Sequence, residues 1–308
     1  MLSPTSSEPE ITVPTEPFAL LLPVFGGDRA DHFERAFRSS VDDQVLRPNQ
    51  VVLVQDGPVN EDLARRIAHV RKTSPVPVTF VQLPNNVGLG EALDAGLAAS
   101  EYDVIARMDA DDISMPHRFQ VQLPLIDAAD IVGAGLLEIA DDIDQVVGRR
   151  VPPVGPDTIR SYARLHDPFN HPTVVYRRQA VQAAGGYSGV VRMEDYWLFA
   201  RMLADGARPV NVAEPLVYYR VGSGAYQRRG GRDMLRVELE LQREMRRAGI
   251  TNRRQFVRNV VVRGGYRLVP WQIRRGMYAK LVATRFEAPS GDSPKSASKD
   301  DPPPRMTG

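Results

Sequence analysis

The sequence contains no cysteine in its 308 residues. Disulfide bonds, thiolate metal sites and a cysteine nucleophile are therefore excluded, and the composition fits a reducing cytoplasm. Long hydrophobic runs are also missing, because no segment approaches the roughly 20 apolar residues that a membrane-spanning helix needs. The N-terminus shows no basic stretch followed by an apolar one, so no signal peptide is expected. The sequence thus predicts a cytoplasmic protein that does not span a membrane.

An excess of charge of one sign is absent overall but present locally. The formal net charge is +1, yet residues 228–285 carry 16 Lys or Arg against four acids. Apolar residues such as Trp271 and Tyr278 interleave with these charges. The pattern fits a surface that binds the anionic inner face of the plasma membrane, and equally a solvated helical cap on the body. Nucleic-acid binding is not expected, because no nucleic-acid-binding motif accompanies the basic residues.

The two ends of the chain are poor in large apolar residues. Residues 1–16 and 287–308 are rich in Pro, Ser and charged residues, so both segments are predicted to be disordered. Between them we place a folded domain over residues 17–226 and the basic helical extension over residues 227–286.

Strand and helix patterns alternate through the first half of this domain. Strands are predicted at 18–25, 50–55, 77–83 and 102–108, with helices beginning near Asp31, after a cap at Asn60, and over 88–100. Such alternation is typical of an α/β fold with a doubly wound, mostly parallel sheet flanked by helices. The second half is less regular, with strands predicted at 130–139, 171–177 and 208–220 and a helix over 194–206.

Acidic side chains follow two of these strands. Asp56 ends the second, and the segment RMDADDISMP (107–116) ends the fourth. Ligands of open α/β sheets bind at the carboxyl ends of the strands. Alternate residues of an extended segment point the same way, so Asp109 and Asp111 could face one Mg²⁺ or Mn²⁺ ion, while Asp112 is expected to serve the loop and the next helix. A solvated turn and the nucleophile loop of a D-x-D phosphatase are the alternatives.

Five segments in order resemble the family 2 glycosyltransferases, which have the GT-A fold. These segments, within residues 18–225, are LLPVFGGDRADHFERAFRSSVDDQVLRPNQVVLVQDGP, NNVGLGEALDAGL, ARMDADDISMPHRF, HPTVVYRR…GGY and MEDYWLFARMLADG. The sequence departs from the family at Phe25-Gly26, where Tyr-Asn is usual, at Gln55, where Asp is usual, and at Asp94, where Asn is usual. The segment QRRG (227–230) lacks the Trp of the processive members' Q-x-x-R-W motif, which implies an enzyme that adds one sugar per encounter.

The resemblance implies a metal-dependent, inverting transfer of one sugar from a nucleoside-diphosphate sugar, with UDP or dTDP as the nucleotide. The acceptor would be a hydroxyl of a saccharide or lipid-linked saccharide in cell-envelope or exopolysaccharide synthesis, which leaves a peripheral place on the membrane open. Asp109 and Asp111 would hold Mn²⁺ or Mg²⁺, and Asp195 would be the general base, with Glu194 orienting it or the acceptor. The donor site would be formed by Pro23, Val24, Phe25, Asp56, Asn86, Gly88, Arg107 and Asp109.

Other residues and other activities complete these expectations. Arg118 is expected to pair with the acid cluster, and His171 and Trp197 are expected to be structural. A nucleotidyltransferase is an alternative, although PVFGGDRA is a poor version of its G-x-G-T-R loop. A metal-dependent module that binds a nucleotide sugar without catalysis is the alternative outside the enzymes.

Overall fold

The computed structural model describes residues 16–221 and 231–269. The predicted disordered ends, the QRRG segment and the extension beyond residue 269 fall outside these ranges, apart from Glu16. Within the described residues, no helix is both long and apolar enough to cross a membrane.

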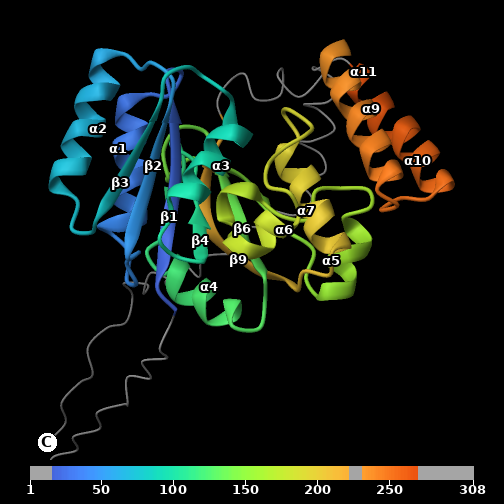
Figure 1. Cartoon of the computed structure of the whole chain (residues 1–308), viewed down its shortest axis with the longest axis horizontal. Helices are drawn as coiled ribbons and strands as arrows, with labels where there is room; N and C mark the ends of the chain where they lie inside the picture. The colour runs from blue at the N-terminus through green and yellow to red at the C-terminus, as the bar shows by residue number, and fades with distance from the viewer. Residues whose placement is uncertain (1–15, 222–230, 270–308) are drawn as a thin grey trace, which may run out of the picture.

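Four parallel strands form one half of the sheet, in the order β3-β2-β1-β4 (Figure 1). They are β1 (Phe18–Phe25), β2 (Gln50–Asp56), β3 (Val78–Leu83) and β4 (Val104–Arg107), joined by α1 (Ala30–Val41), α2 (Glu61–Thr73) and α3 (Leu89–Ala99). Successive side chains of β1 point to opposite faces: Leu20 and Leu22 pack with α1 and α2, while Leu21 packs with α3. The predicted doubly wound parallel sheet is confirmed.

The second half of the sheet is mixed. β8 (Val175–Arg177) pairs antiparallel with β4, and the order continues through β6 (Ile131–Ile139), β9 (Pro209–Arg220) and β5 (Ile113–Ser114), with β7 (Val146–Arg150) on β6. The helix α4 (Arg118–Ile126) covers the α1 face. The opposite face carries α5 (Pro156–Tyr162), α6 (Arg178–Ala183) and α7 (Glu194–Ala204).

Two local expectations need correction. The helix α1 begins at Ala30 after Arg29, so Asp31 lies in its first turn and does not cap it. The strand predicted over 171–177 is a strand only at Val175–Arg177, because its first residues form a 3₁₀ turn, η1 (His171–Thr173). The cap at Asn60 is confirmed, since its side-chain oxygen accepts a hydrogen bond from the Leu63 N–H at 2.9 Å.

The basic extension is helical where the structure describes it. It comprises α9 (Arg232–Arg247), α10 (Arg253–Asn259), the π-helical turn η2 (Val260–Gly264) and α11 (Gly265–Leu268). Met234, Leu241 and Met245 of α9 share an apolar cluster with α7 residues, among them Trp197. Trp197 is only 9% exposed, which confirms it as a core residue.

A buried carboxylate joins the last helices. Glu238 of α9 is fully buried and accepts hydrogen bonds from Arg263 Nε at 2.6 Å and Arg267 Nη2 at 3.0 Å. Burial alone would raise the pKa of Glu238, but these two guanidinium groups lower it below its ordinary value. The Glu238 carboxylate therefore balances the positive charge of the two arginines where η2 and α11 pack against α9.

We expect Glu238→Gln to lower the free energy of unfolding by about 3 kcal/mol, because it leaves buried guanidinium charge uncompensated. Chemical denaturation followed by circular dichroism measures the change, and amide hydrogen exchange shows whether it is confined to α9–α11. Glu240→Gln, at an exposed position of the same helix, is the matched control and should cost less than about 0.5 kcal/mol. Equal losses from the two variants would contradict the structural role of Glu238.

Candidate active site

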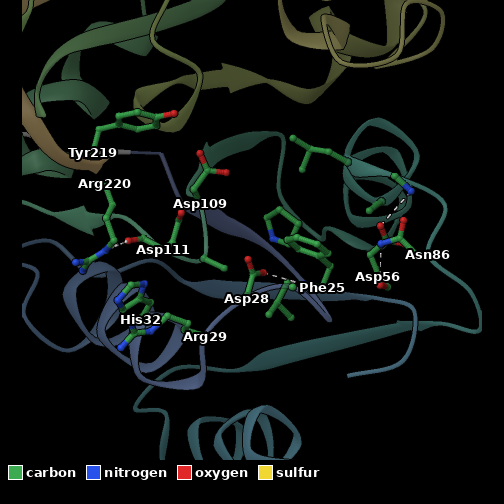
Figure 2. Close-up of a pocket in the computed structure, with 17 residues that line it drawn as sticks. Phe25, Asp28, Arg29, His32, Asp56, Asn86, Asp109, Asp111, Tyr219 and Arg220 are labelled. Atoms are coloured by element: carbon green, nitrogen blue, oxygen red, sulfur yellow. Dashed lines mark hydrogen bonds between the residues drawn. The ribbon is translucent and has the colours of Figure 1, made fainter. Parts of the chain in front are cut away.

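A cavity of about 680 Å³ opens at the carboxyl ends of β1, β2 and β4. Figure 2 shows Asp56 and Asn86 at one end of this strand-end cavity, Tyr219 and Arg220 at the other, and Asp109 and Asp111 between them. The structure thus brings together residues predicted from four separate segments. The predicted residues that line it are Pro23, Val24, Phe25, Asp56, Asn86, Gly88, Asp109 and Asp111.

The Phe25 end of the cavity combines an exposed ring with a rigid turn. Phe25 is 47% exposed, so it is not a core aromatic. The Asp56 carboxylate accepts hydrogen bonds from the N–H groups of Val87 at 2.7 Å and Gly88 at 3.1 Å. Gly57 has φ +80°, and a Cβ there would lie 2.5 Å from the Asn86 nitrogen. Only glycine fits this turn, which holds the 86–88 loop against the end of β2.

The acid cluster carries more negative charge than its surroundings neutralise. Ligand oxygens of Asp109, Asp111 and Asp112 all lie within 4.8 Å of one another. Burial, followed by repulsion from Asp109, raises the pKa of Asp111 to about 6 and that of Asp112 well above its ordinary value. Across the cavity, burial raises the pKa of Asp28 to about 7, with further contributions from Asp111 and Asp109. A hard divalent cation would relieve this repulsion, so these oxygens fit Mg²⁺ or Mn²⁺.

Asp112 fastens this loop to the neighbouring strand. It is fully buried, and its Oδ1 accepts a hydrogen bond from the Arg220 N–H of β9 at 2.8 Å. Its Oδ2 has no hydrogen-bond partner among the described residues. The expectation that Asp112 serves the next helix is wrong, because His117 is the residue that precedes α4.

Two arginines lie beneath the acid cluster. Arg107 is 1% exposed and donates a hydrogen bond from Nη2 to Asp109 Oδ1, so it offsets part of the cluster's negative charge from behind the cavity wall. Its direct contact with a diphosphate stays a prediction. Arg118 was expected to pair with the acids, but it hydrogen-bonds to the Arg107 carbonyl at 2.8 Å and to Gln122 at 3.0 Å. Arg118 therefore supports the backbone of the loop.

Glu194 and Asp195 stand at the start of α7. The Asp195 Oδ1 accepts a hydrogen bond from the Tyr196 N–H at 2.7 Å, and Oδ2 lies 3.8 Å from His171 Nδ1. Burial raises the pKa of Asp195, while the nearby Arg107 lowers it. Burial and Arg107 together hold the pKa of His171 well below its ordinary range, so this imidazole is neutral. His171 Nε2 is hydrogen-bonded to the Tyr187 hydroxyl at 3.0 Å, which fixes the ring beside Asp195.

The start of α7 lies beside the α3 wall of the cavity. A Cβ at Gly90, in the first turn of α3, would approach the Tyr187 carbonyl oxygen to 2.9 Å and Glu194 Cβ to 3.5 Å. Glu194 and Asp195 do not line the 680 Å³ cavity themselves. The structure therefore places Glu194, the first residue of α7, next to the first turn of α3, whose Leu89 lines the cavity.

Further residues that the sequence did not indicate also line the cavity, among them Asp28, His32, Tyr219 and Arg220. Arg220 Nε donates to the Asp111 carbonyl at 2.9 Å, and Arg220 Nη1 reaches Asp141 at 3.3 Å. β9 arrives there because Tyr218 pairs with Ile113 of β5, a long-range register that local sequence does not encode. Asp28 had a usable signal, because it follows the end of the first strand by three residues.

Comparison with known proteins shows which family the chain is similar to. The model of the family described as "Glycosyl transferase family 2" matches residues 23–184. An uncharacterized glycosyltransferase of Haemophilus influenzae is 33% identical over 86% of this chain and 98% of its own. The amylovoran biosynthesis glycosyltransferase AmsE of Erwinia amylovora is 32% identical over 85% of this chain and 98% of its own. The UDP-Gal:alpha-D-GlcNAc-diphosphoundecaprenol beta-1,3-galactosyltransferase of Escherichia coli is 28% identical over 87% and 97%.

Solved structures show the same fold at low sequence identity. S. aureus TarS 1–349 in complex with UDP-GlcNAc has a TM-score of 0.58 at 15% identity, covering 80% of this chain and 70% of its own. Mannosyltransferase PcManGT from Pyrobaculum calidifontis, in complex with GDP-Man and Mn²⁺, has a TM-score of 0.59 at 15% identity, covering 89% and 76%. These likenesses confirm the expected GT-A fold.

Proposed function

The chain belongs to glycosyltransferase family 2, and from this we propose that it moves one sugar from a nucleoside-diphosphate sugar to an acceptor hydroxyl with inversion at the anomeric carbon. The strand-end cavity carries this proposal, because it joins an exposed aromatic ring to an acid cluster suited to a divalent cation. A second pair of carboxylates, Glu194 and Asp195, begins α7, whose first residue lies next to the first turn of α3. The arrangement offers one group for each task of a displacement reaction.

The nucleotide would lie along the ends of β1 and β2. Phe25 would pack against the base, with Pro23 and Val24 beneath it, and Asp56 would accept a hydrogen bond from the base or the ribose. Asn86 and Gly88 would close this side. UDP or dTDP is the proposed nucleotide. In support, the E. coli relative is named for UDP-Gal, and the TarS structure contains UDP-GlcNAc.

Asp109 and Asp111 would hold the Mn²⁺ or Mg²⁺ ion, which, when bound, neutralises charge on the departing diphosphate. Neighbouring residues hold these two carboxylates and their loop in position. Arg107 holds Asp109 from behind, and Asp112 ties the loop to β9 through the Arg220 N–H. The carboxylates are thus positioned before the donor arrives.

Asp195 would act as the general base. Its carboxylate takes the proton of the acceptor hydroxyl as that oxygen forms a bond to the anomeric carbon. The bond from this carbon to the diphosphate oxygen breaks on the opposite side, and a single displacement of this kind inverts the configuration. The Tyr196 N–H holds Asp195 in place, the neutral His171 lies beside it, and Glu194 would orient Asp195 or the acceptor.

The acceptor is proposed to be a saccharide or lipid-linked saccharide of cell-envelope or exopolysaccharide synthesis. AmsE is named for amylovoran biosynthesis, and the E. coli relative is named for a diphosphoundecaprenol-linked acceptor. Such an acceptor would place the enzyme in the cytoplasm or on the inner face of the plasma membrane.

The test is incubation with a panel of nucleoside-diphosphate sugars, Mn²⁺ and saccharide acceptors. We expect nucleoside diphosphate release with one donor, and a product whose anomeric configuration, measured by NMR, is opposite to that of the donor. Retention would rule out the single displacement through Asp195. Hydrolysis of simple phosphoesters in place of transfer would support the phosphatase alternative, and donor binding without release would support a binding module.

A further inference from the structure

The helical run formed by α10, η2 and α11 turns its polar side inward. Asn259 donates to the Gln242 side chain and to the Arg164 carbonyl, both at 2.8 Å. Arg263 and Arg267 bond to the buried Glu238 of α9. The side that packs on the protein is therefore held by charges and amides, where a water-exposed helix ordinarily packs apolar residues.

The outward side of the same run carries several large apolar residues. We call the residues that form it the valine face, and their exposed fractions are Val257 59%, Val261 67%, Val262 55%, Tyr266 39% and Leu268 59%. A contiguous patch of exposed apolar residues marks a binding surface more often than single scattered ones do. Figure 1 draws α10 and α11 at the end of the molecule opposite α2, so this surface is far from the parallel strands.

The charge around the valine face is of one sign. Arg253, Arg254 and Arg258 are exposed along α10, and no Asp or Glu occurs from residue 245 to residue 286. A second copy of this face would bring arginines against arginines. An occupant that is both apolar and anionic satisfies the valines and the arginines together.

We propose that the valine face and its three flanking arginines bind the surface of an anionic lipid bilayer. The valines and Leu268 would enter the boundary between head groups and acyl chains, and the arginines would lie among the anionic head groups. The inward salt bridges to Glu238 keep these helices docked on α9 while the apolar side enters lipid. The purpose of this surface rests on the proposed function. It would hold the enzyme at the membrane, where a lipid-linked acceptor is found.

The test is co-sedimentation of the full-length protein with phosphatidylglycerol vesicles and with phosphatidylcholine vesicles. We expect binding to the former that weakens with added salt, and little binding to the latter. Val257→Ser/Val261→Ser and, separately, Arg253→Gln/Arg254→Gln should each lower the partition coefficient roughly tenfold. Val45→Ser/Val147→Ser is the matched control, because these valines are 65% and 54% exposed on other surfaces, and it should bind like the wild type.

Several outcomes would overturn the proposal. These are no binding to phosphatidylglycerol at low salt, wild-type binding by both face variants, or a dimer in analytical ultracentrifugation that only the valine variant disrupts. Nucleoside diphosphate release with a short water-soluble acceptor is measured without vesicles. Vesicle binding without any transfer would therefore reject the proposed function alone, and transfer without vesicle binding would reject this surface alone.

Discussion

Replacing Asp195 by asparagine is expected to lower kcat about 10³-fold while donor affinity stays within about twofold. Asparagine keeps the size of the side chain and can still accept the hydrogen bond from the Tyr196 N–H. It cannot take a proton from the acceptor hydroxyl. Steady-state kinetics of nucleoside diphosphate release, together with donor titration by calorimetry, separates the two quantities. A parallel loss of donor affinity would show that Asp195 serves the donor site and not the base step.

The control for Asp195→Asn is an aspartate in the first turn of another helix. Asp157 lies exposed in the first turn of α5, and Asp157→Asn should leave kcat unchanged. The pH profile adds a second measurement, because the base must be ionised and activity falls as pH drops through its pKa. Burial raises the pKa of Asp195, so the acidic limb of kcat/KM should lie above the ordinary Asp pKa of about 3.9. A profile that stays flat down to pH 4 would contradict this assignment.

Much of the cavity could be predicted because its residues sit at the ends of locally recognisable strands. The buried run of β1, the alternating apolar face of α2 and the Asn60 cap are all encoded within a few residues. Parallel connections then bring the carboxyl ends of β1, β2 and β4 to one edge, which is why Phe25, Asp56 and Asp109 could be grouped in advance. Local sequence and topology sufficed for this part.

The remainder of the site depends on contacts between distant segments. Asp112 was assigned to the next helix because helix starts commonly use Asp, yet the β5–β9 pairing brings Arg220 to it from 108 positions away. Arg118 has the charge to pair with the acids, but the carbonyl of Arg107 lies nearer. In the sequence of the basic extension, arginines and valines are interleaved. Only the packing against Glu238 decides which of these side chains turn inward. Competition among several partners, rather than propensity, decides each of these cases.

Asp111→Asn is expected to have opposite effects on stability with and without divalent cations. In the metal-free protein the pKa of Asp111 is raised to about 6, above its value of about 3.9 in the unfolded chain. Its ionised form therefore destabilises the fold at pH 7.5, and that cost disappears as pH falls below both values. The asparagine variant carries no such charge, so without metal its melting temperature at pH 7.5 should be at least that of the wild type.

With Mn²⁺ the order should reverse, because a cation that binds only the folded wild type raises its apparent stability and the variant has lost a ligand. We expect the Mn²⁺-dependent thermal shift to disappear in Asp111→Asn and kcat/KM to fall about 10²- to 10³-fold. Asp144→Asn removes an exposed acid outside the cavity and should change neither quantity. If Asp111→Asn kept the full Mn²⁺ shift, Asp109 and Asp112 would have to hold the ion by themselves. Asp112, whose buried Oδ2 is unpaired among the described residues, would then be a ligand and not only a fastening for β9.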